Sequence, residues 1–143
     1  MKQILRTVTL LGVLMLAASA VFAQSQRGTI VNIPFAFNVG EKTLPAGEYR
    51  IEPYRRETDK VWLIQNQEQH VGTFVMTIPV RSNTTREEGQ LIFNRYGDRY
   101  FLSKVWTPGT NTGIELPVSR QERAVEVAST TERQTYVLTA HND

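Results

Sequence analysis

The sequence of 143 residues contains no cysteine. This absence excludes disulfide bonds, thiolate metal sites, cysteine nucleophiles and a lipid-modified N-terminal cysteine. Histidine is scarce too, since the chain has two, His70 and His141, and their separation fits no zinc-binding spacing. We therefore expect a protein without a metal site or cofactor, whose stability comes from an apolar core.

An excess of charge of one sign is also missing once the N-terminal segment is set aside. The chain carries 16 Lys and Arg against 14 Asp and Glu, and Lys2 and Arg6 both lie in the first 23 positions. The remaining chain balances at 14 basic and 14 acidic side chains. No glycine-rich phosphate motif and no basic stripe with interleaved aromatic residues occurs. A nucleic acid is therefore not an expected partner.

The first 23 residues have the three parts of a secretory signal peptide. Lys2 and Arg6 give a positive start, an apolar run follows from Leu10 to Ala18, and Val21-Phe22-Ala23 offers a cleavage site. The apolar run is shorter than the roughly 20 residues that span a bilayer. We expect cleavage before Gln24, no stable membrane span afterwards, and an exported protein in the periplasm or outside the cell.

The rest of the chain reads as strands joined by turns. Residues 24–28 are polar and predict a loose tether, and residues 29–143 predict a single β domain. Apolar residues alternate from Val31 to Phe37, which is typical of a half-buried strand, and Pro34 favours an edge position or a bulge. Val71 to Val80 predicts one further strand, and Arg81 to Gly89 a polar loop. The pattern predicts an all-β fold of about seven or eight strands, in a sandwich or a squat barrel.

A hairpin is the most specific local prediction. Tyr96-Gly97-Asp98-Arg99 lies between apolar runs, and Gly-Asp favours a two-residue turn with Gly97 at a positive φ. The expected register pairs Tyr96 with Arg99, Arg95 with Tyr100, Phe93 with Leu102 and Leu91 with Lys104. It stacks Arg95 on Tyr100 and Arg99 on Tyr96, as cation–aromatic pairs. These four residues, Arg95, Tyr96, Arg99 and Tyr100, either stiffen the hairpin or bind a carboxylate, sugar or peptide group of a partner.

One short helix is expected in the C-terminal half, near residues 119–128. Ser119 and Glu122 have the spacing of a capping box. Ala124, Val125 and Ala128 would then lie on one side of the helix.

Catalytic groups lack partners in the sequence. Glu87 and Glu88 are adjacent, so in an extended segment they point to opposite faces. A serine nucleophile needs histidine and acid partners, whereas His141 lies near the chain end and Ser103 within a predicted strand. We therefore expect a non-enzymatic envelope module that binds or supports a partner, which would be an envelope protein or a glycan.

Two other functions stay open. The first is a small β-barrel that holds an apolar ligand, with Trp62, Phe74, Phe93 and Trp106 facing inward. The second is an unrecognised hydrolase.

Three blocks of sequence carry a resemblance. They are VNIPFAFNVG at 31–40, TLPAGEY at 43–49 and RYGDRYF at 95–101. Together with their surroundings, from about residue 29 to 128, they resemble a family of small exported β-rich proteins of acidobacterial-type soil bacteria. The resemblance implies a bacterial envelope location and brings no catalytic residues. The TLPAGEY block is also similar to one edge of transthyretin-like and other β-sandwich modules, where it encodes a turn followed by a strand.

Overall fold

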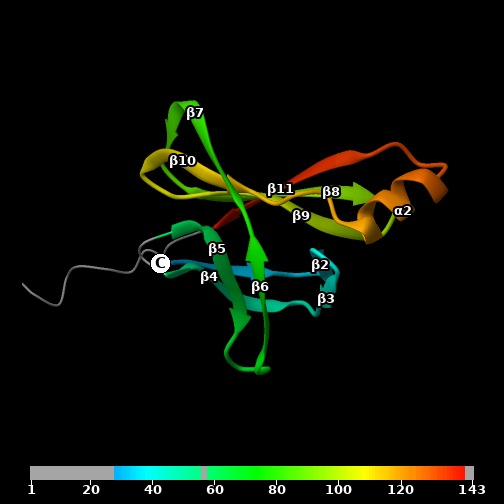
Figure 1. Cartoon of the computed structure of the whole chain (residues 1–143), viewed down its shortest axis with the longest axis horizontal. Helices are drawn as coiled ribbons and strands as arrows, with labels where there is room; N and C mark the ends of the chain where they lie inside the picture. The colour runs from blue at the N-terminus through cyan, green and yellow to red at the C-terminus, as the bar shows by residue number, and fades with distance from the viewer. Residues whose placement is uncertain (1–27, 56–57, 141–143) are drawn as a thin grey trace, which may run out of the picture.

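The computed structural model describes residues 28–55 and 58–140. The predicted signal peptide, residues 24–27 of the predicted tether, and His141 lie outside these residues. The described part contains eleven strands and one helix, labelled as in Figure 1. They are β1 (Thr29–Ile33), β2 (Phe37–Val39), β3 (Lys42–Leu44), β4 (Gly47–Arg55), β5 (Thr58–Asn66), β6 (Val71–Met76), β7 (Ile78–Arg86), β8 (Gly89–Tyr96), β9 (Arg99–Trp106), β10 (Thr110–Glu115), α2 (Arg120–Ala128) and β11 (Gln134–Ala140).

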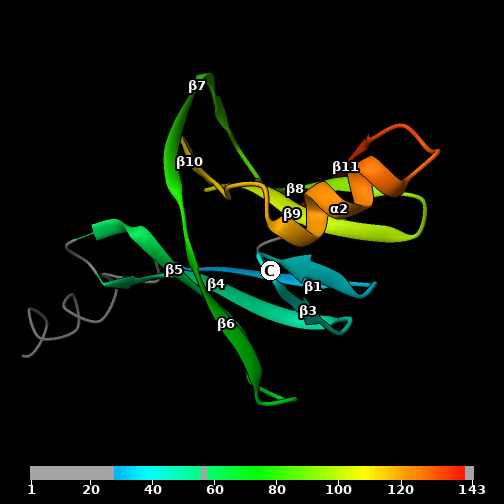
Figure 2. The same cartoon turned by 45° about the vertical axis from the view of Figure 1, so that its right-hand side comes forward.

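The strands form two sheets that pack face to face (Figures 1 and 2). The four-stranded sheet has the order β1-β4-β5-β6, and the second sheet has the order β11-β8-β9-β10-β7. β2 joins the second sheet through a parallel pair with β9, and β3 is attached to it through an antiparallel pair with β2. The all-β class with one helix is confirmed. The architecture is a sandwich, because in the described part of the chain the two sheets do not close into a barrel.

The number of strands exceeds the predicted seven or eight for two reasons. β1 ends at Ile33, because Pro34 has no amide hydrogen to continue a ladder. The predicted strand from Val71 to Val80 is two strands, β6 in one sheet and β7 in the other (Figure 2). Thr77 lies at the crossing, buried, and its amide donates to the Lys60 carbonyl over 2.8 Å.

The prediction of a polar loop from Arg81 to Gly89 was also wrong, because most of this segment is a strand. β7 continues to Arg86, leaving Glu87 and Glu88 as the turn before β8. Within residues 28–55 and 58–140, β7 is an edge strand that pairs with β10 alone. Polar residues therefore occupy positions that in a central strand would be apolar.

One apolar cluster fills the space between the sheets. Its largest fully buried members include Phe37, Tyr49 and Phe93. The turn before β4 is held by this cluster, because the buried Tyr49 hydroxyl donates to the Pro45 carbonyl over 2.7 Å. The TLPAGEY block is thus a turn closed by its own tyrosine.

Of the four aromatic residues expected to face a common interior, Trp62 and Phe93 belong to this cluster. Phe74 is 58% exposed on the opposite face of its sheet. Trp106 is buried too, but it does not face the core. Its neighbour Val105 pairs with Ile114, and both of these residues belong to the core cluster, whereas Trp106 pairs with Gly113. Because adjacent strand residues face opposite sides, Trp106 lies on the outer face of the second sheet.

The predicted hairpin is present and its register is confirmed near the turn. Tyr96 pairs with Arg99, Arg95 with Tyr100 and Phe93 with Leu102. Beyond that point the prediction was wrong, since Leu91 pairs with Val105 instead of Lys104. A β-bulge near Ser103 inserts one extra residue into β9. The bulge turns Val105 into the core and Trp106 away from it.

Gly97 occupies the predicted positive-φ position, with φ of 62° in a two-residue turn. We predict that Gly97→Val lowers the free energy of unfolding by about 1–3 kcal/mol, because a β-branched residue is strained in this region. Gly97→Asn is the matched control, since asparagine tolerates the left-handed region. Denaturant unfolding measures both, and equal stability of the valine variant and the wild type would contradict the prediction.

Candidate functional site

The hairpin end brings Arg95 and Tyr100 together as predicted. The Arg95 guanidinium carbon lies 5.3 Å from the Tyr100 ring centroid, and Arg95 Nε donates to the Gly97 carbonyl over 2.7 Å. The Tyr100 ring stacks on Phe35 with centroids 3.9 Å apart, and Tyr136 packs edge-on against both rings. This face of the hairpin therefore carries a half-buried aromatic cluster under one arginine.

The other predicted contact, the stacking of Arg99 on Tyr96, was wrong, although the two residues do pair across the strands. The Arg99 guanidinium lies over Phe101, at 5.5 Å from its ring centroid. Tyr96 is 4% exposed, and its hydroxyl donates to Glu122 Oε1 over 3.2 Å. Cross-strand pairing places Tyr96 and Arg99 on the face of the hairpin opposite Arg95 and Tyr100. The four predicted site residues thus form two groups rather than one surface, and Arg95, Arg99 and Tyr100 reach solvent.

Helix α2 explains why Tyr96 is covered. One of the two hydrogen bonds of the predicted capping box is present, since Ser119 Oγ accepts from the Glu122 amide over 3.0 Å. The Glu122 side chain turns to the hairpin instead, and its Oε1 also accepts from Asn94 Nδ2 over 2.8 Å. Glu41 from the β2–β3 turn supplies a further cap, accepting from the Arg120 amide over 2.7 Å. A negative side chain is stabilising at a helix N-terminus.

The face that α2 presents differs from the prediction. Ala124 and Ala128 are exposed, and Glu122 is the buried residue of the helix. The helix is therefore held to the hairpin through a buried carboxylate more than through its apolar residues. Sequence spacing revealed the cap, but no signal in the sequence pointed to Asn94 and Tyr96 as its other partners.

The environment of Tyr96 keeps its phenol protonated. Burial raises the pKa of Tyr96 above 10.0, and the negative charges of Glu122 and Glu126 raise it further. Because the folded-state pKa is the higher one, the stability that the protonated phenol contributes is complete below pH 10 and is lost as the pH rises through the raised pKa. At neutral pH this tyrosine is a hydrogen-bond donor to Glu122.

A second surface was missed by sequence reasoning. On the outer face of the four-stranded sheet, cross-strand pairs align Val61 with Met76 and Leu63 with Phe74. The Tyr54 ring meets the Phe74 ring edge-on, with centroids 4.7 Å apart. We call these five residues the outer patch. The apolar run at 61–64 could have indicated this patch. A strand that is apolar on both faces places apolar residues on its solvent side as well as in the core.

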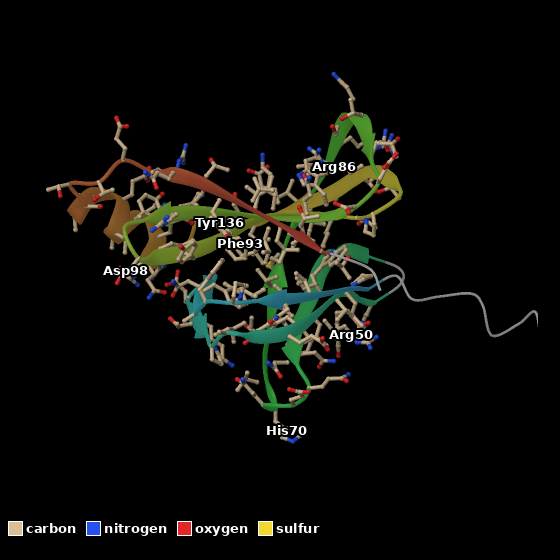
Figure 3. All side chains as sticks on the ribbon, turned by 180° about the vertical axis from the view of Figure 1, so that it is seen from behind. Arg50, His70, Arg86, Phe93, Asp98 and Tyr136 are labelled. Carbon is tan, nitrogen blue, oxygen red and sulfur yellow. The ribbon has the colours of Figure 1, made fainter. Side chains whose placement is uncertain are left out.

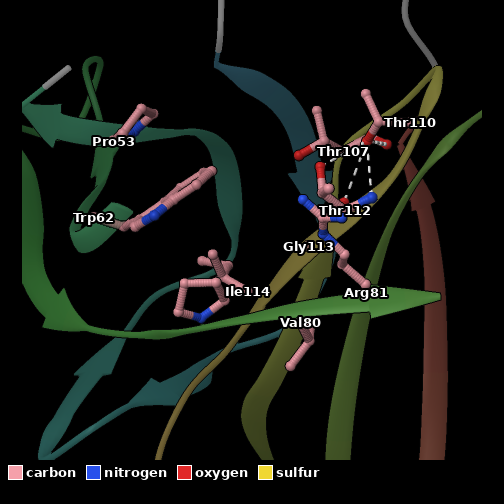
Figure 4. A pocket seen from close by; sticks show the side chains of 10 residues that line it. Pro53, Trp62, Val80, Arg81, Thr107, Thr110, Thr112, Gly113 and Ile114 are labelled. Carbon is pink, nitrogen blue, oxygen red and sulfur yellow. Dashed lines mark hydrogen bonds between the residues drawn. The ribbon is translucent and has the colours of Figure 1, made fainter. Parts of the chain in front are cut away.

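A third feature is a cleft of about 360 Å³ between the sheets, near Pro53 and the β9–β10 turn (Figure 4). Trp62 and Ile114 contribute to its apolar side. Arg81, Thr107 and Thr112 line the other side.

His70 and Asp98, two groups able to take part in acid–base chemistry, lie apart. Exposed His70 occupies the β5–β6 turn, far from Asp98 at the tip of the β8–β9 hairpin (Figure 3). Glu87 and Glu88 are exposed in a turn. Among the described residues, no group of three or more His, Asp or Glu side chains is arranged to hold a metal ion. No helix in that part of the chain is long and apolar enough to cross a membrane.

Comparison with protein-family models, with curated proteins and with solved structures finds no match to this chain.

We predict that Glu122→Ala lowers the free energy of unfolding by about 1–3 kcal/mol, because it leaves the buried Tyr96 hydroxyl and the Asn94 amide without their acceptor. Glu126→Ala, an exposed acid on the same helix, is the matched control and should change stability by less than about 0.5 kcal/mol. Urea unfolding of both variants is the measurement. A loss no larger for the Glu122 variant than for the control would contradict the assignment.

Proposed function

We propose that this chain is an exported module of the bacterial cell envelope that binds a protein partner through the outer patch and catalyses no reaction. The observation that carries the proposal is the exposure of large apolar side chains on one sheet face. Phe74 is 58% exposed, Met76 70% and Tyr54 52%. A contiguous exposed apolar surface of this kind is typical of an interaction site.

The chemistry of the outer patch favours a protein as the partner. Aromatic residues, methionine and arginine are enriched at protein interfaces, and the patch combines Tyr54, Phe74 and Met76 with Arg55 at its rim. The Arg55 guanidinium lies 5.7 Å from the Tyr54 ring centroid. The edge-to-face contact of Tyr54 with Phe74 restricts both rings before binding, which lowers the entropy lost on association.

The patch also lies beside a partly protected sheet edge. β6 is an edge strand of the four-stranded sheet, and Lys42 Nζ donates to the Gly72 carbonyl over 2.7 Å. A lysine at a strand edge discourages pairing with another strand. The partner is therefore expected to dock on the face of the sheet instead of extending it by a further strand.

Export is supported by the sequence. Lys2 and Arg6, the apolar run and Val21-Phe22-Ala23 form a signal peptide pattern. The resemblance to small exported proteins of soil bacteria agrees with that location.

The non-enzymatic part of the proposal is supported by how the polar groups are used. His70 is exposed in a turn with no acid paired to it among the described residues. Glu122, the buried carboxylate, holds a helix to a hairpin. A glycan remains the other partner class, and Arg95, Arg99 and Tyr100 at the hairpin end are the residues that would bind it.

The test is capture of envelope proteins by the immobilised exported protein. Phe74→Ser combined with Met76→Ser should reduce capture of the bound protein by about tenfold or more, as expected for central interface residues. Val127→Ser with Val137→Ser is the matched control, because both valines are exposed on other elements. Melting curves should be unchanged for both variants.

Equal capture by the patch variant and the control would contradict the proposal. An added Arg95→Ala, Arg99→Ala variant locates the alternative. If that variant alone loses binding, the site is the hairpin end, and sensitivity of the captured material to glycosidases would identify a glycan.

A further inference from the structure

The cleft between the sheets is separate from the outer patch. Pro53 and Trp62 reach it from the four-stranded sheet, and Pro79 and Ile114 from the second sheet. Trp62 pairs across the strands with Pro53 and Val75, whereas its neighbours Val61 and Leu63 face outward. The cleft and the outer patch therefore lie on opposite faces of the same strands, and one can be altered without the other.

The volume of the cleft suits a small ligand. It measures about 360 Å³, near the lower end of the roughly 300–1,000 Å³ that ligand pockets occupy. Rigid groups keep it open, since Pro53 and Pro79 have fixed backbone angles and Trp62 is a large flat ring that is 8% exposed. This space accommodates one or two rings rather than a long chain.

The two sides of the cleft differ in chemistry. Figure 4 shows Trp62, Pro53 and Ile114 on one side and Thr107, Thr110 and Thr112 on the other. The Arg81 side chain extends from β7 toward the threonines. A ligand in the cleft would thus meet an apolar ring on one side and hydroxyl groups with a guanidinium on the other.

Arg81 is the one charged residue among the described residues that line the cleft. In the part of the chain whose side chains are described, the ion pair is Lys104 with Glu115, and Arg81 has no carboxylate partner. An arginine guanidinium offers a planar set of donors that matches a carboxylate. The cleft therefore selects a negative group next to a flat apolar surface.

The threonines argue against a neutral sugar. Thr110 Oγ1 is already within 3.1 Å of the Thr107 carbonyl and of Thr112 Oγ1, and within 3.3 Å of the Thr112 carbonyl. The Thr110 and Thr112 hydroxyls thus already have partners within the protein, and no carboxylate or amide side chain is present among the described lining residues.

We propose that this cleft binds a small aromatic carboxylate, with its ring against Trp62 between Pro53 and Pro79 and its carboxylate paired with Arg81. The ring gains by leaving water for an apolar surface, and the carboxylate gains charge-assisted hydrogen bonds. This site is additional to the partner surface and does not depend on it.

Tryptophan fluorescence offers a direct test, because the chain has two tryptophans and Trp106 lies outside the cleft lining. The Trp106→Phe variant makes Trp62 the sole reporter. Titration with sodium benzoate should change the Trp62 emission saturably, whereas benzamide, its neutral counterpart, should bind about tenfold more weakly or not at all. Calorimetric titration of the unaltered protein repeats the comparison in case the variant is unstable.

Two arginine variants separate the site from general charge effects. Arg81→Gln should weaken benzoate binding about tenfold and leave benzamide binding unchanged. Arg50→Gln is the matched control, since Arg50 lies on the four-stranded sheet (Figure 3) and is not among the residues that line the cleft. This variant should bind benzoate as the wild type does. The proposal is overturned by three results: no saturable binding in either titration, equal affinity for benzoate and benzamide, or benzoate binding that Arg81→Gln does not weaken.

Discussion

The two sheets meet around the buried ring of Phe37. Phe37 is fully buried, and its ring centroid lies 5.0 Å from Tyr49 of the four-stranded sheet and 5.8 Å from Phe93 of the second sheet. No disulfide can replace this contact, because the chain has no cysteine. Its strand, β2, is fixed by Asn38, whose Nδ2 donates to the Tyr100 carbonyl over 2.9 Å. Burial of large rings in a close-packed interior is what holds the two layers together.

Away from the packing around Phe37, two surfaces of the four-stranded sheet stay accessible to a ligand or a partner. Farther along β4, at Pro53, the sheets enclose the cleft beside Trp62. On the far side of the same sheet, Phe74 and its neighbours have no covering layer among the described residues. The outer patch thus arises because β5 is apolar on two faces whereas the core needs only one of them. A four-stranded sheet that only stabilised the fold would carry polar residues on its solvent face.

The features that could be predicted from the sequence are those where one residue type satisfies a local requirement. Gly97 marked the hairpin turn because few other residues accept its backbone angle, and Ser119 marked the helix start because its hydroxyl caps an amide. The features that could not be predicted are those that tertiary contacts determine. The bulge near Ser103 reverses which side of β9 faces inward, and the crossing at Thr77 divides one apolar run between two sheets. The contact of Arg99 with Phe101 and the burial of Tyr96 beside Glu122 are likewise tertiary contacts.

The central claim, that the outer patch is a binding surface, is tested most directly by photo-crosslinking in living cells. A photoreactive benzophenone amino acid in place of Phe74 should form one defined covalent adduct with an envelope protein upon illumination. The same amino acid in place of Val137, also exposed but on β11, should not form that adduct. An absence of any adduct at position 74, or the same adduct at both positions, would contradict the account.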